Sequence, residues 1–205
     1  MKLHLLLALS FLLGALSFQV KRLSLNMLAI GEIAPDFTLS TSSGSSVKLS
    51  SFKGKKPVVV FFYPADNTPG CTKEACAFEK KAPDFKAKGA HHMNIDNLFR
   101  NFKISILLII NIGAEVVGIS SGGAADKEKF IRANNLNSMK LLIDAGDSVR
   151  KSWGVPKALF GVLPGRVTYV IGKDGKVASI YDDLANAELH PVKALAALEE
   201  ISKKK

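Results

Sequence analysis

Residues 58–76 contain a predicted strand, a turn and the start of a helix, and they run Val58-Val-Val-Phe-Phe-Tyr63-Pro-Ala-Asp-Asn-Thr68-Pro-Gly-Cys71-Thr-Lys-Glu-Ala-Cys76. The first six residues form a continuous β-branched and aromatic run, which is typical of a strand covered on both faces. The prolines and glycine that follow predict a turn. From about Gly70 onward the segment is predicted to be helical. This order of elements favours an α/β fold.

The same stretch holds both cysteines of the chain, Cys71 and Cys76. Cys71 falls in the first turn of the predicted helix, where free N–H groups and the positive end of the helix dipole favour a thiolate. Because the thiolate is the reactive form of cysteine, Cys71 is the first candidate for chemistry. The alternative is that both residues are buried small apolar side chains, which fits Cys76 better than Cys71.

The spacing of the two cysteines limits how they can react. On an ideal helix, Cα atoms five residues apart are separated by about 8.6 Å and by about 140° around the axis. A disulfide requires Cα atoms within about 7 Å of each other. Cys71 and Cys76 are therefore expected to bond only after the helix unwinds locally. A zinc site is not expected, because there is no second cysteine pair and the histidines (His4, His91, His92 and His190) are not spaced as ligands.

Pro64, Thr68 and Cys71 form the pattern P-x-x-x-T-x-x-C, the active-site signature of peroxiredoxins. Residues 62–76 resemble the peroxiredoxin Q, or bacterioferritin-comigratory-protein, branch, in which a second cysteine follows five residues after the first. Residues 31–39, 149–155 and 163–170 resemble further landmarks of this branch. The resemblance covers about residues 29–90 and 113–200. It implies a thioredoxin-like sandwich, with a central mixed sheet flanked by helices and an N-terminal β-hairpin.

The resemblance also implies a function and a role for each matching residue. The function would be a thiol-specific peroxidase that reduces hydrogen peroxide and organic hydroperoxides, is recycled by thioredoxin or a similar dithiol, and uses no metal or organic cofactor. Cys71 would be the peroxidatic nucleophile and Cys76 the resolving cysteine that forms a disulfide with it. Thr68 would offer its hydroxyl to thiolate and peroxide, Pro64 would shield the pocket, and Arg166 would stabilise the thiolate and polarise the peroxide. A monomer is also implied.

Other interpretations of these residues remain open at this point. The two cysteines suit a redox sensor or binding protein without significant turnover as well as an enzyme. Arg166 follows a turn and has the alternative of a surface arginine, and Thr68 has the alternative of a turn residue or helix N-cap.

Length and composition fit a single globular domain. The chain has 205 residues, of which 47% are hydrophobic and 22% charged, with a formal net charge of +10. Part of this charge lies near the ends, in Lys2, Lys21, Arg22 and residues 203–205. No basic stripe is interleaved with aromatic residues, so nucleic-acid binding is not expected.

The N-terminal residues predict targeting. Residues 1–17 resemble a signal peptide, with a polar start, about a dozen apolar residues, and small residues before a cleavage site. That stretch is too short to span a bilayer comfortably, so no stable membrane span is expected. Residues 18–28 contain two bases and no acids, as a transit peptide does. Together they predict the bipartite presequence of a secondary plastid, with the secretory pathway as the alternative. Residues 29–205 are then the peroxiredoxin domain.

Further elements follow from periodicity and turn signals. Strands are predicted at 37–39, 47–49, 115–120, 141–144, 167–172 and 176–181, with hairpins joining the first pair and the last pair. Helices are predicted at 71–88, 126–134 and 191–203. Pro83 is expected to kink or divide the first helix.

Residues 91–112 interrupt the resemblance. The family runs from the reactive helix almost directly into the next strand, whereas here 22 residues rich in Ile, Asn, Leu, Phe and Lys intervene before Gly113. These residue types have A/T-rich codons, so we expect a translated intron or a gene-model error, and a product that the insertion makes inactive is an alternative to the enzyme. The alternative is a genuine insertion with 104–112 as an added strand or partner surface.

Overall fold

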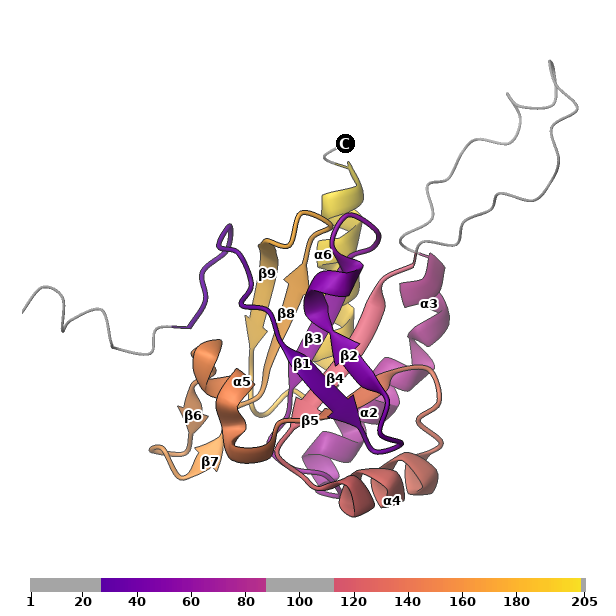
Figure 1. The fold of residues 1–205 in the computed structure, drawn as a ribbon, viewed down its shortest axis with the longest axis vertical. Coiled ribbons are helices and arrows are strands. Elements are labelled where there is room, and N and C mark those ends of the chain that lie inside the picture. Colours follow the sequence, from indigo (N-terminus) through magenta and orange to yellow (C-terminus); the bar gives the residue numbers. More distant parts are fainter. Residues whose placement is uncertain (1–26, 88–112, 204–205) are drawn as a thin grey trace, which may run out of the picture.

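The computed structural model of the chain describes residues 27–87 and 113–203, which form an α/β sandwich around one central sheet (Figure 1). The sheet has seven strands in the order β2-β1-β5-β4-β3-β8-β9. In chain order the strands are β1 (Thr38–Thr41), β2 (Ser46–Lys48), β3 (Val58–Phe62), β4 (Glu115–Ser120), β5 (Lys140–Ile143), β8 (Val167–Ile171) and β9 (Val177–Asp182).

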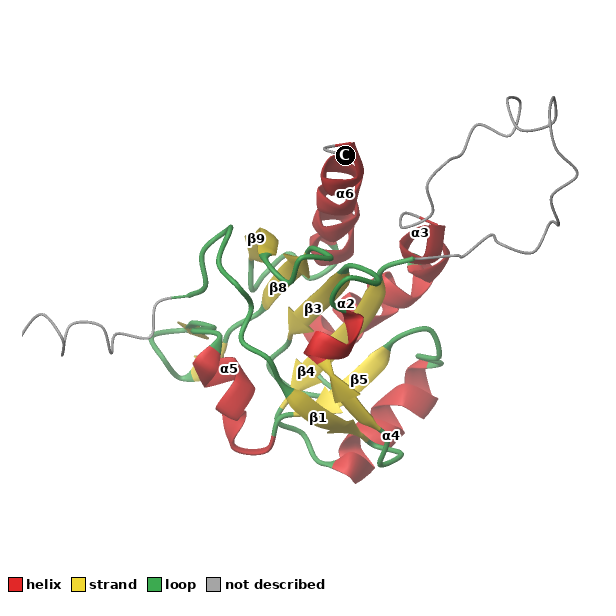
Figure 2. Cartoon of the chain, turned by 45° about the horizontal axis from the view of Figure 1, so that its top comes forward, coloured by secondary structure: helices red, strands yellow, loops and turns green. Residues whose placement is uncertain are grey.

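Helices cover this sheet, and a small separate hairpin lies at its side. The helices are α2 (Pro69–Lys80), α3 (Ala82–Ala87), α4 (Ala124–Asn134), α5 (Ser148–Ser152) and α6 (Leu189–Lys203), and the hairpin pairs β6 (Lys157–Ala158) with β7 (Leu163–Pro164). Figure 2 shows α6 beside β8 and β9, against which it packs. Within the described residues, no helix is long and apolar enough to cross a bilayer.

Strand β3 lies at the centre of the sheet and leads through a short turn to the helix that carries Cys71. It pairs in parallel with β4 and antiparallel with β8. All five of its residues are buried, as its unbroken apolar sequence predicted. Val58, Val60 and Phe62 point into one core, and Val59 and Phe61 into the other. The strand is therefore held on both faces and forms a rigid base for the turn that follows it.

Each face of the sheet has an aromatic centre. On one face Trp153 contacts Phe62 and Tyr169 edge-on, with ring centroids 5.4 and 5.1 Å apart. On the other, Phe78 of α2 stacks on Phe61 of β3 at 4.3 Å. The Phe78 stack holds α2 on the sheet about two turns after Cys71. This contact does not hold the N-terminal turn of α2, which contains Cys71.

Most of the predicted elements are confirmed, with ends that agree or differ by one or two residues. The helix that carries both cysteines begins at Pro69, and it is divided as expected: α2 ends at Lys80 and α3 begins at Ala82, one residue before Pro83. The closing hairpin turns at Gly175, whose φ of +83° requires glycine. Helix α5 and the β6–β7 hairpin were not predicted from periodicity, because elements of two to five residues are too short to show any.

The inserted stretch 91–112 and the N-terminal targeting segments, 1–17 and most of 18–28, lie outside the described residues. The described residues on either side of the insertion are in direct contact. Ala114 N donates a hydrogen bond to Phe85 O at 2.9 Å, and a Cβ on Gly113 would lie 2.4 Å from Lys86 O. The end of α3 and the start of β4 are thus adjacent.

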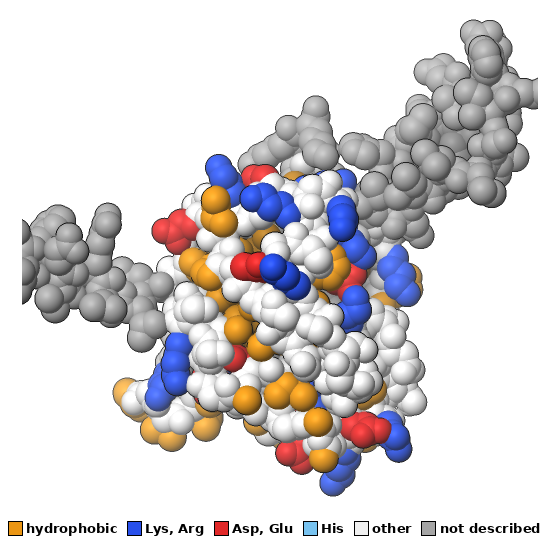
Figure 3. Space-filling model, in the orientation of Figure 1, with side chains coloured by type: hydrophobic (Ala, Val, Ile, Leu, Met, Phe, Trp, Pro, Cys, Tyr) orange, Lys and Arg blue, Asp and Glu red, His pale blue; other side chains and the backbone are white. Residues whose placement is uncertain are grey.

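The β6–β7 hairpin carries an exposed apolar patch, formed by Leu159, Phe160, Val162 and Leu163. Figure 3 shows hydrophobic side chains gathered at its lower left, where Figure 1 places this hairpin. Leu159 and Phe160 adopt φ values of +46° and +56°, which bulky residues rarely adopt. The hairpin ends at Pro164, two residues before Arg166, so its conformation sets the entry of the chain into the candidate active site.

Candidate active site

The turn after β3 places Cys71 in the first helical turn of α2. Thr68 is the N-cap residue, Pro69 occupies the first helical position, and Cys71 is third. Proline is favoured at that first position because the N–H it lacks has no partner inside the helix. The Cys71 side chain is 1% exposed and its thiol is free. A buried sulfur at a helix N-terminus favours the thiolate only where a cationic partner compensates its charge.

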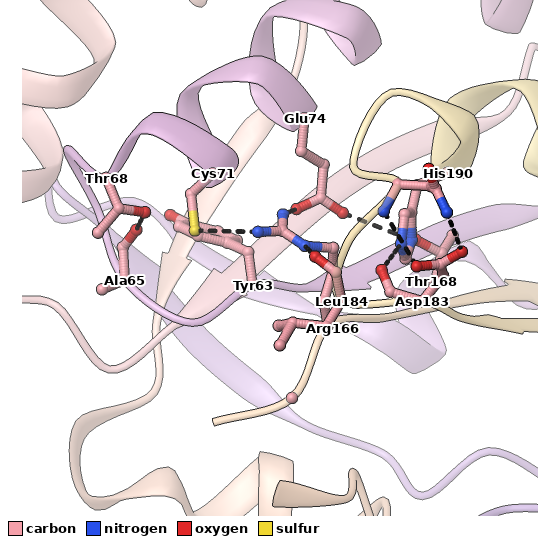
Figure 4. Close-up of polar contacts among 12 residues, drawn as sticks. Tyr63, Ala65, Thr68, Cys71, Glu74, Arg166, Thr168, Asp183, Leu184 and His190 are labelled. Atoms are coloured by element: carbon pink, nitrogen blue, oxygen red, sulfur yellow. Dashed lines mark hydrogen bonds and ion pairs between the residues drawn. The ribbon is translucent and has the colours of Figure 1, made fainter. Parts of the chain in front are cut away.

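Arg166 provides that partner from the beginning of β8, 95 residues further along the chain. Its Nη2 lies 3.6 Å from Cys71 Sγ, as Figure 4 shows. Its Nε donates to Leu184 O at 3.2 Å, and its Nη1 forms a buried ion pair with Glu74 Oε2. Gly70 leaves room for this guanidinium, because a Cβ there would lie 3.1 Å from Nη2. The arginine is therefore held by Leu184 O and Glu74, and its third contact directs an N–H at the Cys71 sulfur.

Behind Arg166, Glu74 and His190 form a second buried layer (Figure 4). Both side chains are fully buried. His190 Nε2 donates to Asp183 O at 2.8 Å, while His190 Nδ1 lies 2.7 Å from Thr168 Oγ1 and 3.5 Å from Glu74 Oε1. Glu74 Oε1 has no hydrogen-bond partner. One polar atom of the site is thus buried without a partner and faces a titratable nitrogen.

Arg150 of α5 joins the segment that leads to Cys71 and the segment that leads to Arg166. Its Nη2 donates to Tyr63 O at 2.7 Å, at the end of β3, and its Nη1 donates to Gly165 O at 2.8 Å, just before Arg166. Its guanidinium lies over the Phe62 ring at 5.5 Å. Burial lowers the pKa of Arg150, and nearby carboxylates oppose that shift. Because an arginine stays charged, it also adds positive potential near the sulfur.

A buried ion pair fixes the turn between β3 and α2. Lys127 of α4 is fully buried, and its Nζ lies 3.2 Å from Asp66 Oδ2 and 2.7 Å from Ser120 Oγ. Tyr63 OH donates to Asp66 Oδ1 at 2.5 Å. Burial, together with the charge of Asp66, raises the pKa of Tyr63 well above its ordinary value. Gly122 makes space for the carboxylate, because a Cβ there would lie 2.0 Å from Asp66 Oδ2.

The other candidates from the sequence lie around this centre without bonding to the sulfur. Thr68 is exposed, makes no capping bond with its hydroxyl, and donates instead to Ala65 O at 3.3 Å. Pro64 is half-buried at the end of β3. Cys76 is half-buried between α2 and α4, with its Sγ 4.0 Å from Asn134 Oδ1. Both cysteines lie within the intact α2, which is the arrangement that forbids a direct disulfide.

The sequence did not single out several residues of the site: Glu74, Arg150, Lys127, Asp66 and His190. A signal existed for Glu74, which follows Cys71 by three residues and so lies on the same helix face. His190 appeared in the sequence only among the histidines that are not spaced as metal ligands. Nothing in the sequence near Arg150 or Lys127 indicates burial, since a lysine or arginine in a short polar helix is usually exposed. Among the described residues, no group of three or more His, Cys, Asp or Glu side chains could hold a metal ion.

Known proteins resemble both the sequence and the fold. The AhpC/TSA family matches residues 30–98 and 108–180, leaving part of the inserted stretch unmatched. The chloroplastic peroxiredoxin Q of Oryza sativa subsp. japonica is 44% identical over 171 residues, which are 83% of this chain and 67% of that protein. The chloroplastic peroxiredoxin Q of Sedum lineare is 43% identical over 171 residues, covering 83% of this chain and 78% of that protein.

A solved structure extends the likeness to three dimensions. Peroxidoxin BcpB from Mycobacterium tuberculosis superposes with a TM-score of 0.67 at 33% identity, over 86% of this chain and 99% of that chain. The fold is therefore the thioredoxin-like fold that the resemblance implied. The chain belongs to the AhpC/TSA family, and within it to the peroxiredoxin Q branch of thiol peroxidases.

Proposed function

We propose that the chain reduces hydrogen peroxide and organic hydroperoxides through a Cys71 thiolate and an intramolecular disulfide with Cys76. The observation that carries this proposal is Arg166 Nη2 at 3.6 Å from a buried Cys71 Sγ in the first turn of α2. A fixed guanidinium beside a sulfur at a helix N-terminus stabilises negative charge there and in the leaving oxygen.

The first step forms a sulfur–oxygen bond and breaks the peroxide bond. Cys71 Sγ attacks the terminal peroxide oxygen, which keeps its hydrogen and becomes the sulfenic acid. The other oxygen leaves with the electron pair of the O–O bond and takes up one proton, giving water or an alcohol. Arg166 is placed to donate to that oxygen as its charge develops. The exposed Thr68 hydroxyl, at the N-cap, would turn from Ala65 O to a bound peroxide.

The second step requires α2 to unwind. The Cys76 thiol condenses with the sulfenic acid, releasing water and forming the disulfide. Because the two cysteines are five positions apart on the helix, the first turns of α2 must open before the sulfurs meet. The Phe78 stack on Phe61 lies beyond both cysteines and would stay in place during that opening. Thioredoxin or a similar dithiol would then reduce the disulfide and restore both thiols.

We further propose a plastid location and a monomeric state. The location is supported by the relatives, which are named as chloroplastic. A bipartite presequence in residues 1–28 is our proposal for how the chain reaches a plastid. Import into isolated plastids, with mass measurement of the mature N-terminus, tests it. Retention of residues 1–28 after import would contradict it. Sedimentation of the reduced protein tests the monomer.

The test of the function is peroxide consumption by the full 205-residue chain with a thioredoxin system. We expect turnover with both hydrogen peroxide and an alkyl hydroperoxide. A parallel form lacking residues 91–112 separates the site from the insertion. If only the shortened form turns over peroxide, the insertion causes the inactivity of the full chain. If neither form turns over peroxide, the proposed peroxidase function is wrong. Transcript reads that join Ala90 directly to Gly113 or its neighbours would show that the insertion is not translated.

Changing Arg166 to glutamine is expected to slow the reaction of Cys71 with hydrogen peroxide by roughly 10²–10³-fold, the usual cost of removing one preorganised donor. The variant removes the charge at 3.6 Å from the sulfur. Stopped-flow measurement of the second-order rate constant checks it. The control is Arg132→Gln on α4, whose exposed arginine pairs with Glu128. Equal rates in the two variants would contradict the role.

Changing Cys76 to serine is expected to leave sulfenic acid formation intact and to block the disulfide. One equivalent of peroxide should be consumed rapidly, after which dimedone should label Cys71, as measured by mass spectrometry. Cys76 is half-buried and does not contact Arg166, so the first step should keep its rate. Normal recycling of this variant by thioredoxin would show that Cys76 is not the resolving cysteine.

A further inference from the structure

The buried layer behind Arg166 contains a proton site that the proposed reaction does not use. Glu74 Oε1 is buried with no hydrogen-bond partner, and His190 Nδ1 lies 3.5 Å away from it. Unpartnered buried carboxylate oxygens are costly and rare in folded proteins. A proton placed between these two atoms would remove that cost.

The hydrogen bonds of His190 fix which of its nitrogens is free. The Asp183 carbonyl at 2.8 Å only accepts, so His190 Nε2 carries a hydrogen. In neutral His190, Nδ1 is then an acceptor and receives the hydroxyl of Thr168 at 2.7 Å. An added proton has two positions, on Glu74 Oε1 facing Nδ1 or on Nδ1 facing Oε1. Because Nδ1 has a single lone pair, the pair binds one proton once the Thr168 hydroxyl hydrogen turns away from Nδ1.

The net charge of the buried groups predicts when this proton is bound and when it is released. Arg150 is also charged, but it forms its own ion pair with Asp147 at 3.4 Å. The charges left to balance are those of Cys71, Arg166 and the Glu74–His190 pair. With Cys71 as a thiolate, these groups are neutral together only if Glu74 and His190 carry one proton. Once Cys71 is a neutral sulfenic acid, these groups are neutral only if that proton has left and Glu74 alone balances Arg166. Uncompensated buried charge is strongly unfavourable, so oxidation of Cys71 should expel the proton.

We propose that Glu74 and His190 hold one shared proton while Cys71 is a thiolate and release it when Cys71 becomes a sulfenic acid. This inference rests on the proposed function. Without the pair, the leaving oxygen takes its proton from solution, and each sulfenic acid formed consumes one proton. With the pair, the proton released offsets the one consumed, and net uptake from solution is zero. Glu74 and His190 are thus positioning residues that act on the sulfur through Arg166.

The surroundings of the pair favour one shared proton near neutral pH. Burial raises the pKa of Glu74 to about 8, opposed by the ion pair with Arg166 and by Arg150 of α5. Burial lowers the pKa of His190 to about 4, opposed by its bond to the Asp183 carbonyl, while Arg166 lowers it further.

The remaining neighbours of the pair do not supply a second proton. The Tyr181 ring of β9 lies edge-on to His190 at 4.7 Å between centroids, and its hydroxyl is directed to Asp183. The Asp183 carboxylate is held by Asn186, and Asn186 is the first cause of its pKa of about 2. Thr168 contributes a neutral hydroxyl from β8.

The experiment counts protons per sulfenic acid in the full chain carrying Cys76→Ser, which stops the reaction after the first step. The protein is mixed with one equivalent of hydrogen peroxide in weak buffer containing a pH indicator, near pH 7. Thiolate absorbance at 240 nm confirms beforehand that Cys71 is ionised, and dimedone labelling gives the amount of sulfenic acid. We expect a net uptake close to zero. Uptake of one proton per sulfenic acid would overturn the inference.

Three further variants, one of them a control, locate the effect. Glu74→Gln keeps an amide in the same space but cannot release a proton, so uptake should rise to one per sulfenic acid wherever Cys71 is still a thiolate. The control is Glu79→Gln on the same helix, whose carboxylate accepts from Ser138 N far from the sulfur. It should leave the count near zero. His190→Asn should shift the pH at which the proton uptake per sulfenic acid changes. An unchanged pH profile would show that His190 does not share the proton with Glu74.

Failure of this inference is distinct from failure of the proposed function. If no dimedone-reactive sulfenic acid forms, the peroxidase assignment fails and no protons are counted. If sulfenic acid forms with a full proton taken from solution, the peroxidase stands and the shared proton is wrong. Should Glu74→Gln not fold, the count in Cys76→Ser alone still decides, because it needs no change within the pair.

Discussion

Changing Cys71 to serine is expected to reduce peroxide turnover to the uncatalysed background. A serine hydroxyl stays protonated beside Arg166 and cannot be oxidised by peroxide to the equivalent of a sulfenic acid. The substitution is otherwise small, because the hydroxyl can accept the Arg166 Nη2 hydrogen bond that the sulfur receives at 3.6 Å. Coupled consumption of NADPH by a thioredoxin system, with hydrogen peroxide as substrate, measures the loss.

The matched control for this variant is Cys76→Ser, which makes the same chemical change five residues along the same helix. It should retain a single rapid turnover, whereas Cys71→Ser should show none. Thermal unfolding of the two variants should be similar, which excludes misfolding as the cause. Residual rapid consumption of peroxide by Cys71→Ser would place the nucleophile elsewhere in the chain.

Changing Lys127 to methionine is expected to lower the free energy of unfolding by about 3–5 kcal/mol, the usual cost of removing one partner of a buried ion pair. Lys127 and the Asp66 side chain are 0% and 3% exposed, so the carboxylate left behind cannot regain water. It would keep only the hydroxyl bonds from Tyr63 and Ser120. Urea unfolding monitored by circular dichroism measures the change.

The exposed pair Arg132–Glu128 on the same helix is the control, and its loss should cost only about 0.2–0.5 kcal/mol. The double variant Lys127→Met/Asp66→Leu should recover much of the lost stability, because no charge remains buried. A Lys127→Met cost as small as that of the exposed pair would mean that the buried cluster does not hold the turn.

Local sequence patterns predicted the frame of this protein well. The run Val58–Tyr63 is apolar throughout, and only a strand covered on both faces buries such a run, as β3 does. Pro83 lacks an amide hydrogen and crowds the preceding turn, so the break between α2 and α3 was predictable. The motif around Cys71 identified the family from the sequence because Pro64, Thr68 and Cys71 lie close together in the chain.

The shortest elements could not be predicted from the sequence, because a periodic pattern needs more residues than they contain. Helix α5 has five residues, which is too few to show a periodic pattern. It is held by the Asp144 carboxylate, which accepts from Val149 N at 3.1 Å and Arg150 N at 2.9 Å. Such a helix is stabilised by a side chain outside it, so its own sequence carries little signal.

The sequence by itself therefore determined the strand–turn–helix that carries Cys71, the spacing that forbids a disulfide in an intact helix, and the family. Only the tertiary structure decided how the charges around the sulfur are arranged. Glu74, Arg150, Lys127 and His190 would each be expected at a surface from their local sequence, and each is buried because segments distant in the chain close over it. Burial depends on segments that are distant in the chain. Because buried charges are not screened by water, the charge state of each buried residue depends on the charges of its buried neighbours.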